Sequence, residues 1–299
     1  MYITEIKAYD YIALKQTLLS LSKKYPLLNI SYIGKSCAGR DIPAVKIGKS
    51  QEYALIAAAF HGTEYITETV LLRFIESLCK ALQNDESIAG FNARKAMFGR
   101  GVIFVPCVNP DGCEIVLHGS SAAGFMAENV LRIAGGNLKK WNANLRGVDI
   151  NHNFDADWEK LRKMECEAGI TGPALTRFGG FRAESEPETL ALTTLCRTKR
   201  IRHVAALHSQ GQEIYWKYGD YEPARSRKMA EIMATTSGYM LSEPKGLAVG
   251  GGFKDWFIKE FNRPGFTVEM GKGENPLPIE TAKEIYERLE EMLMLTVIM

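Results

Sequence analysis

Ala59-Phe60-His61-Gly62-Thr63-Glu64 is the stretch that decides the fold, because an apolar run stops here at a His-x-x-Glu motif. The run from Tyr53 to Phe60 reads YALIAAAF, which is too short for a typical helix and predicts a buried strand. His61 then lies at the carboxyl end of that strand, where open α/β sheets usually hold their binding sites. Imidazole and carboxylate groups are good zinc ligands, and the short spacing lets both side chains turn toward one point. In the alternative interpretation, Glu64 is a carboxylate that suits the first turn of a helix.

Two further apolar runs end in the same way. Residues 202–207 lead into His208-Ser209-Gln210-Gly211, and residues 264–268 lead into Glu269-Met270-Gly271. Three predicted strands therefore end in His, His and Glu, each followed closely by a glycine. Only five histidines occur in the chain, so two of them at equivalent strand ends indicate a shared site rather than core packing.

The composition is that of a globular α/β protein. Of the 299 residues, 46% are hydrophobic, which is ample for a sizeable core. The formal charge of +2 comes from 37 basic and 35 acidic residues and gives no argument for binding nucleic acid or a membrane surface. Strands alternate with helices and no linker-like stretch interrupts them. We therefore expect a single α/β domain over residues 1–299, with helices on both faces of the sheet.

The cysteines and the N-terminus bear on the cellular location. None of the six cysteines forms a C-x-x-C pair, which argues against a structural zinc ribbon and favours reduced, buried thiols. The N-terminal residues show no basic segment followed by an apolar one, so no signal peptide is predicted. No run approaches the ~18 apolar residues that span a bilayer. These features predict a cytoplasmic protein.

Helical spacing of apolar residues predicts helices at residues 10–24, 63–82, 253–261 and 279–299. Ser185-Glu186-Pro187-Glu188 has the pattern of a capping box, with Ser185 as the N-cap of a further helix. The intervening residues 118–140 and 155–182 are rich in glycine and lack a clear period. We expect both segments to be mostly loop.

Five motifs, taken in order, resemble the zinc carboxypeptidase family, and the resemblance covers nearly the whole chain. They are His61-Gly-Thr-Glu64, Asn109-Pro-Asp-Gly112, Gly147-Val-Asp-Ile-Asn-His-Asn-Phe154, His208-Ser-Gln-Gly-Gln212 and Glu269 before Met-Gly. The resemblance implies a three-layer α/β/α domain on a mixed, mostly parallel eight-stranded sheet. It also implies one catalytic Zn²⁺ held by His61, Glu64 and His208, with Glu269 as the general base and acid.

The chemistry of these residue types agrees with that implication. Three protein ligands leave a fourth position for water, as in catalytic rather than structural zinc sites. Zinc lowers the pKa of that water to about 7 and polarises the scissile carbonyl. The carboxylate of Glu269 can then take the proton of the water and pass it to the leaving amine.

The sequence departs from the family at the residues that bind substrate. The Asn-Arg pair that holds a terminal carboxylate in the family reads Asn151-His152 here, and an imidazole lacks the permanently charged fork of a guanidinium. The family arginine that polarises the carbonyl is also displaced, and we assign this role to the nearest arginine, Arg146. In the alternative interpretation, Arg146 is a solvated loop residue. The family's mobile tyrosine falls on Leu247, so no tyrosine role is predicted.

Several segments look most like the bacterial γ-D-glutamyl–diaminopimelate peptidases, among them His208–Trp216 and Pro264–Glu269. Diaminopimelate carries a second amine and carboxylate at its far end. Lys254 falls in the leaving-side pocket of the family, where a lysine would suit that distal carboxylate. In the alternative interpretation, Lys254 is a helix lysine that points into water.

Three functions remain open from the sequence. The first is a zinc peptidase that cleaves murein-derived peptides, with muropeptide fragments as substrates. The second is a zinc carboxypeptidase that acts on ordinary peptides, and the third is a zinc-binding protein without turnover. No nucleic-acid or membrane partner is predicted, and the oligomeric state is left open.

Overall fold

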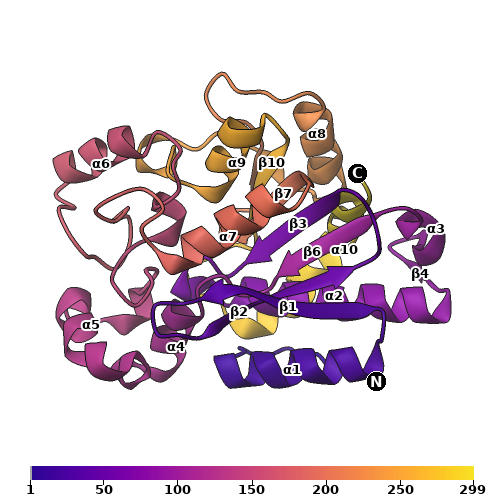
Figure 1. Cartoon of the computed structure of the whole chain (residues 1–299), viewed down its shortest axis with the longest axis horizontal. Coiled ribbons are helices and arrows are strands. Elements are labelled where there is room, and N and C mark those ends of the chain that lie inside the picture. Colours follow the sequence, from indigo (N-terminus) through magenta and orange to yellow (C-terminus); the bar gives the residue numbers. More distant parts are fainter. Residues whose placement is uncertain (1) are drawn as a thin grey trace.

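Eight strands form one sheet in the order β1-β2-β6-β3-β7-β10-β8-β9 (Figure 1). This computed structural model describes residues 2–299. The strands β6, β3, β7 and β10 run parallel to one another, whereas β1, β2 and β8 each pair antiparallel with a neighbour. The predicted mixed, mostly parallel eight-stranded sheet is therefore confirmed. The strand bounds are β1 Leu28–Lys35, β2 Asp41–Ile47, β3 Tyr53–Ala58, β6 Gly101–Val105, β7 Ile201–His208, β8 Glu213–Tyr215, β9 Met240–Leu241 and β10 Gly265–Glu269, with a separate hairpin of β4 Ser87–Ile88 and β5 Phe91–Asn92.

Helices cover both faces of the sheet. Side chains of β3 alternate between the two faces, so Ala54 and Ile56 join one apolar cluster while Leu55 and Ala57 join the other. The first cluster is completed by helices α1, α2, α8 and α10, and the second by α7 and α9. Figure 1 shows α7 on the opposite side of the sheet from α1 and α2. The bounds are α1 Tyr11–Lys24, α2 Ile66–Asn84, α7 Pro187–Thr198, α8 Ser226–Ser237, α9 Phe253–Phe261 and α10 Ala282–Ile298.

The carboxyl ends of three central strands meet at one edge of the sheet. Ala58 of β3 pairs with Leu207 of β7, and His208 of β7 pairs with Glu269 of β10. The strand β3 ends at Ala58, two residues earlier than predicted, because Ala59 has a φ of 52° and leaves the extended conformation. This edge therefore receives the histidines and the glutamate that the sequence placed at strand ends.

Two segments that were expected to be loop contain helices. Residues 118–140 hold α5 (Ala127–Ala134) between two 3₁₀ turns, and residues 155–182 hold α6 (Trp158–Glu167). The helix α5 buries only Val130 and Ala134, and α6 buries only Leu161 and Glu165. The helix α5 has only eight residues, too short for a helical period to stand out, and α6 buries a single apolar side chain. The remaining elements are η1 Gly62–Glu64, α3 Ala93–Met97, α4 Pro110–His118, η2 Ser120–Met126, η3 Leu138–Lys140, η4 Ile150–His152, η5 Gly246–Ala248 and η6 Ile279–Thr281.

The predicted capping box before α7 is wrong in detail. Glu186, not Ser185, occupies the N-cap position, and the Ser185 hydroxyl donates to Oε1 of Glu186 at 2.8 Å. The serine is thus engaged by a carboxylate and does not accept from the first turn of the helix. In the part of the chain that the structure describes, no helix combines the length and the apolar character that crossing a bilayer requires.

Candidate active site

His61 leaves β3 through a turn that requires a glycine. The Gly62 N–H donates to the carbonyl oxygen of Asn142 at 3.1 Å. A Cβ on Gly62 would lie 2.5 Å from the carbonyl oxygens of Gly112 and Trp141, a distance that real Cβ atoms do not reach. Only glycine therefore allows the backbone to approach this closely and to direct His61 toward the pocket.

Asn109 connects this turn to the segment that follows Trp141. Its side-chain amide is fully buried and donates to the carbonyl oxygens of Phe60 and Ala143, each at 3.1 Å. Its Oδ1 accepts from the N–H of Gly112 at 2.9 Å, which caps α4. A single amide thus fixes the residue before His61 relative to two other segments of the chain.

Three side chains converge as the sequence predicted. His61 Nδ1 lies 2.8 Å from Oε1 of Glu64, and His208 Nδ1 lies 2.9 Å from Oε2 of the same carboxylate. The donor atoms of all three residues lie within 4.8 Å of one another. Burial alone would raise the pKa of Glu64, but the two imidazoles lower it to about 2. The carboxylate between the histidines is therefore ionised.

Asp149 makes this arrangement suitable for a metal. Its Oδ1 lies 3.0 Å from His61 Nε2, so both ring nitrogens of His61 face carboxylate oxygens. A neutral imidazole has only one N–H. With that N–H donated to Asp149, the lone pair of Nδ1 is free for a metal, as is usual for histidine ligands of zinc. Burial would raise the pKa of Asp149, yet the positive charge that His61 carries when protonated, without a metal, holds the pKa of Asp149 well below its usual range. Two imidazole nitrogens and one carboxylate fit zinc.

Glu269 lies beside these ligands without belonging to the set. It follows Val268 at the end of β10, pairs in register with His208, and lines the pocket. Burial, and next the charge of Glu64, raise the pKa of Glu269 well above its ordinary value. A divalent cation between the ligands would oppose that rise. This location is what a general base requires, although its role stays a prediction.

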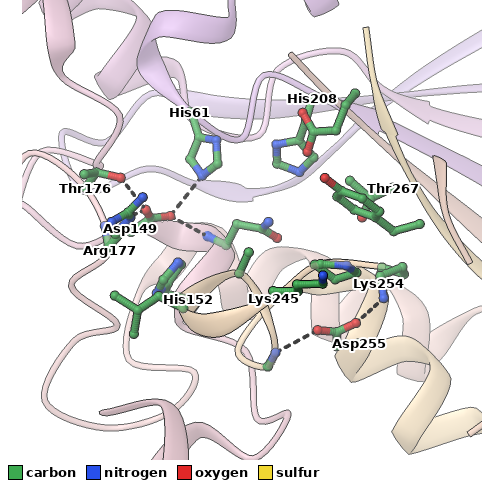
Figure 2. Close-up of a pocket in the computed structure, with 18 residues that line it drawn as sticks. His61, Asp149, His152, Thr176, Arg177, His208, Lys245, Lys254, Asp255 and Thr267 are labelled. Atoms are coloured by element: carbon green, nitrogen blue, oxygen red, sulfur yellow. Dashed lines mark hydrogen bonds and ion pairs between the residues drawn. The ribbon is translucent and has the colours of Figure 1, made fainter. Parts of the chain in front are cut away.

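A pocket of about 330 Å³ opens at this edge of the sheet (Figure 2). Its wall includes His61, His208 and Glu269, which bring the metal ligands and the predicted base to one cavity. The pocket also takes in all three predicted substrate-binding residues, which are Asn151, His152 and Lys254.

Asn151 and His152 are both held by other side chains or backbone. Asn151 Oδ1 accepts from the N–H of Phe253 at 3.0 Å, which fixes the start of α9. His152 Nδ1 lies 2.7 Å from Oε1 of Glu165, a fully buried carboxylate of α6. Arg162 forms an ion pair with the second oxygen of Glu165. The imidazole of His152 is therefore fixed in orientation on the pocket wall.

Lys254 points into the pocket and not into water, so the alternative interpretation of a solvated lysine is wrong. The residue is only 4% exposed. Its ammonium group donates to the carbonyl oxygen of Lys217 at 2.7 Å and forms an ion pair with Asp255. An ammonium group has three N–H donors, so one remains for a ligand.

Arg146 lies outside the pocket. Its side chain is 55% exposed and its guanidinium lies 3.6 Å from Oε2 of Glu186. The structure thus does not bring Arg146 to the metal ligands. Among arginines of the described residues, Arg177 lines the pocket instead.

No role was predicted for three residues that line this site, which are Asp149, Arg177 and Lys245. Asp149 lies within the Gly147–Phe154 motif, and its spacing from Asn151 is the only available signal. Arg177 lies in a segment predicted to be loop, and Lys245 follows the short strand β9. Neither cation had a pattern that could reveal it.

Comparisons with known proteins agree with the fold and the site. A sequence profile of the family described as zinc carboxypeptidase matches residues 14–294. A "Gamma-D-glutamyl-L-diamino acid endopeptidase 1" of Lysinibacillus sphaericus is 35% identical over 282 residues, which is 93% of this chain and 69% of that protein. The uncharacterized protein YqgT of Bacillus subtilis (strain 168) is 33% identical over 98% of this chain and 78% of its own length.

Solved structures show the same fold at lower identity. Thrombin activatable fibrinolysis inhibitor has a TM-score of 0.77 and 17% identity, over 99% of this chain and 76% of that one. The murein-tripeptide amidase MpaA of Escherichia coli O157 has a TM-score of 0.56 and 22% identity, over 89% and 92% of the two chains. With a matching profile over most of its length and the His61, Glu64 and His208 zinc site in place, this chain belongs to the zinc carboxypeptidase family and is a zinc metallopeptidase.

Proposed function

We propose that this peptidase hydrolyses the amide bond between a γ-linked D-glutamyl residue and diaminopimelate in peptides derived from peptidoglycan. The observation that carries the proposal is the buried ammonium group of Lys254 in the pocket, with one donor uncommitted. A diaminopimelate leaving group would place its distal carboxylate against this donor. Charge-assisted hydrogen bonds of this kind are stronger than neutral ones, most of all where water is excluded.

The name of the Lysinibacillus relative supports the same substrate class, because that protein is called an endopeptidase for γ-D-glutamyl-L-diamino acid bonds. An identity of 35% supports the same zinc peptidase chemistry in this chain. The substrate is our inference. The cytoplasmic location likewise stays a prediction, which fractionation of the source cells would test.

The residues of the pocket have different roles in the hydrolysis. When bound, zinc would polarise the scissile carbonyl and lower the pKa of water at the site. Glu269 accepts one proton from the attacking water as its oxygen adds to the carbonyl carbon. The same carboxyl group then gives this proton to the amine as the carbon–nitrogen bond breaks. Asp149 keeps the ring of His61 in one tautomer and orientation throughout.

A pair of matched peptides tests the proposal. L-Ala-γ-D-Glu-meso-diaminopimelate and L-Ala-γ-D-Glu-L-Lys differ in the distal carboxylate of the leaving residue. We expect the zinc-loaded enzyme to cleave the first with a kcat/KM about 10- to 100-fold higher, and Lys254→Met to abolish most of that preference. Cleavage of ordinary C-terminal residues with equal or greater efficiency would favour a carboxypeptidase instead. Failure to cleave any γ-glutamyl peptide would refute the proposal.

A further inference from the structure

Arg177 is held on the pocket wall by its backbone. Its N–H donates to Oδ2 of Asp149 at 2.7 Å, and the Thr176 hydroxyl donates to the same oxygen at 3.1 Å. The φ of 64° at Arg177 lies in the left-handed region, which is costly for a residue with a Cβ and recurs at functional sites. Because the other oxygen of Asp149 faces His61, one carboxylate positions both a zinc ligand and Arg177.

The guanidinium of Arg177 has no hydrogen-bond or ion-pair partner among residues 2–299. Several arginines of the described residues are paired instead, as Arg40 is with Asp111 at 2.7 Å and Arg197 with Glu184 at 2.8 Å. Arg177 is therefore a permanent positive charge with five unused N–H donors, on a backbone fixed beside the catalytic metal site. Such a group is suited to an anion that arrives with the substrate.

The position of Arg177 indicates which part of the substrate it meets. Figure 2 shows Arg177 and Lys254 on opposite sides of the pocket, with His61 and His208 along the edge between them. The proposed function places the leaving residue toward Lys254. The acyl group then extends from the scissile carbonyl toward the opposite side, where Arg177 lies.

We propose that Arg177 forms a subsite for the free carboxylate of the glutamyl residue on the acyl side of the scissile bond; this inference rests on the proposed function. A glutamyl residue linked through its γ-carboxyl group retains its α-carboxylate, four bonds from the scissile carbonyl carbon. A guanidinium binds such a carboxylate through two parallel hydrogen bonds. Arg177 then selects γ-glutamyl substrates on the acyl side, as Lys254 selects diaminopimelate on the leaving side.

Amidation of the substrate provides a direct test. In the peptide L-Ala-γ-D-isoglutaminyl-meso-diaminopimelate, an amide replaces only the carboxylate that Arg177 is proposed to bind. We expect the wild-type zinc enzyme to prefer the carboxylate peptide by about 10- to 100-fold in kcat/KM. In Arg177→Gln, we expect KM for the carboxylate peptide to rise until the two peptides are cleaved alike, with little change for the amide. Arg177→Lys should retain part of the preference.

Arg182→Gln is a matched control, because Arg182 is an exposed arginine of the same segment that does not line the pocket. It should keep the wild-type preference. Equal losses of kcat for both peptides in Arg177→Gln would overturn the inference and assign the guanidinium to the carbonyl oxygen. Wild-type enzyme that cleaves both peptides equally would also overturn it while leaving the proposed function intact. Cleavage of neither peptide by wild-type enzyme would instead refute the proposed function itself.

Discussion

Glu269 makes no side-chain hydrogen bond to the described residues, although it lines the pocket beside His208. Glu269→Gln keeps the size of the side chain and removes the proton acceptor. We expect kcat to fall by about 10²- to 10⁴-fold. The zinc content should stay unchanged, because Glu269 is outside the ligand set. Steady-state hydrolysis and metal analysis of the purified variant check both expectations.

Glu274→Gln provides the control for Glu269→Gln, since Glu274 is exposed in the turn that follows β10. It should retain wild-type activity. A loss of zinc from Glu269→Gln, or an unchanged kcat, would contradict the role assigned to the base.

His203 gives the stability of the protein a pH dependence of its own. It is buried in β7, its Nε2 donates to the carbonyl oxygen of Thr296 at 2.7 Å, and burial together with Arg202 lowers its pKa from 6.5 to about 3. Below about pH 6.5 the unfolded chain binds a proton here that the folded chain does not, so stability falls as the pH falls. The loss is about 1.4 kcal/mol per pH unit down to the folded pKa.

Urea unfolding at several pH values between about 4 and 7 measures this effect. His203→Gln retains a donor for Thr296 but does not titrate, so its free energy of unfolding should fall less steeply toward acid than that of the wild type. Parallel curves for the two proteins would show that His203 does not contribute.

The turn of Gly62, between β3 and α2, is the element on which the metal site depends. In Gly62→Ala the added Cβ would meet two backbone oxygens at 2.5 Å, and backbone cannot move aside as a flexible side chain can. We expect a loss of about 1–3 kcal/mol in the free energy of unfolding and weaker zinc binding, because His61 is displaced. Gly172→Ala is the control, since a Cβ there meets nothing within 4 Å. Equal stability of the two variants would contradict the prediction.

Elements with a strong apolar pattern were predictable from the sequence, and elements held by polar groups were not. The central strands β3 and β7 are buried except at one residue each, so their ends, and with them His61 and His208, could be located. The helix α6 could not, because its buried residues are Leu161 and the carboxylate Glu165. Glu165 is buried because Arg162, one turn earlier in α6, and His152, from another segment, pair with it, and the contact with His152 exists only in the folded chain.

The same reasoning explains the arginines. The prediction that Arg146 polarises the carbonyl rests on its closeness in sequence to Trp141. Closeness in sequence does not establish that the guanidinium reaches the site in space. Arg177 reaches the pocket because Asp149, in another segment, binds its backbone N–H. The ligand set could be predicted from strand ends, whereas the substrate-binding charges depend on how loops pack on one another.

Zinc should stabilise the whole molecule and not only the site. The Glu64 carboxylate lies between the imidazoles of His61 and His208 in the folded chain. The unfolded chain does not bring these three ligands together, so zinc binds the folded state preferentially. Mass action then gives about 2.7 kcal/mol of stabilisation when free zinc exceeds its Kd by 100-fold. Calorimetry with zinc and with a chelator should show a Tm several degrees higher with zinc. His208→Ala should abolish that difference, and a zinc-dependent Tm in this variant would contradict the ligand assignment.

The backbone contact between residue 177 and Asp149 separates support of the metal ligand from recognition of the substrate. The N–H supports the imidazole of a ligand through Asp149, and every residue except proline supplies that N–H. The side chain at position 177 is therefore free to change during divergence without loosening the metal. Substitutions at position 177 can therefore change which peptides are bound while the support of the metal ligand is kept, and this makes the position a starting point for the design of new substrate specificity.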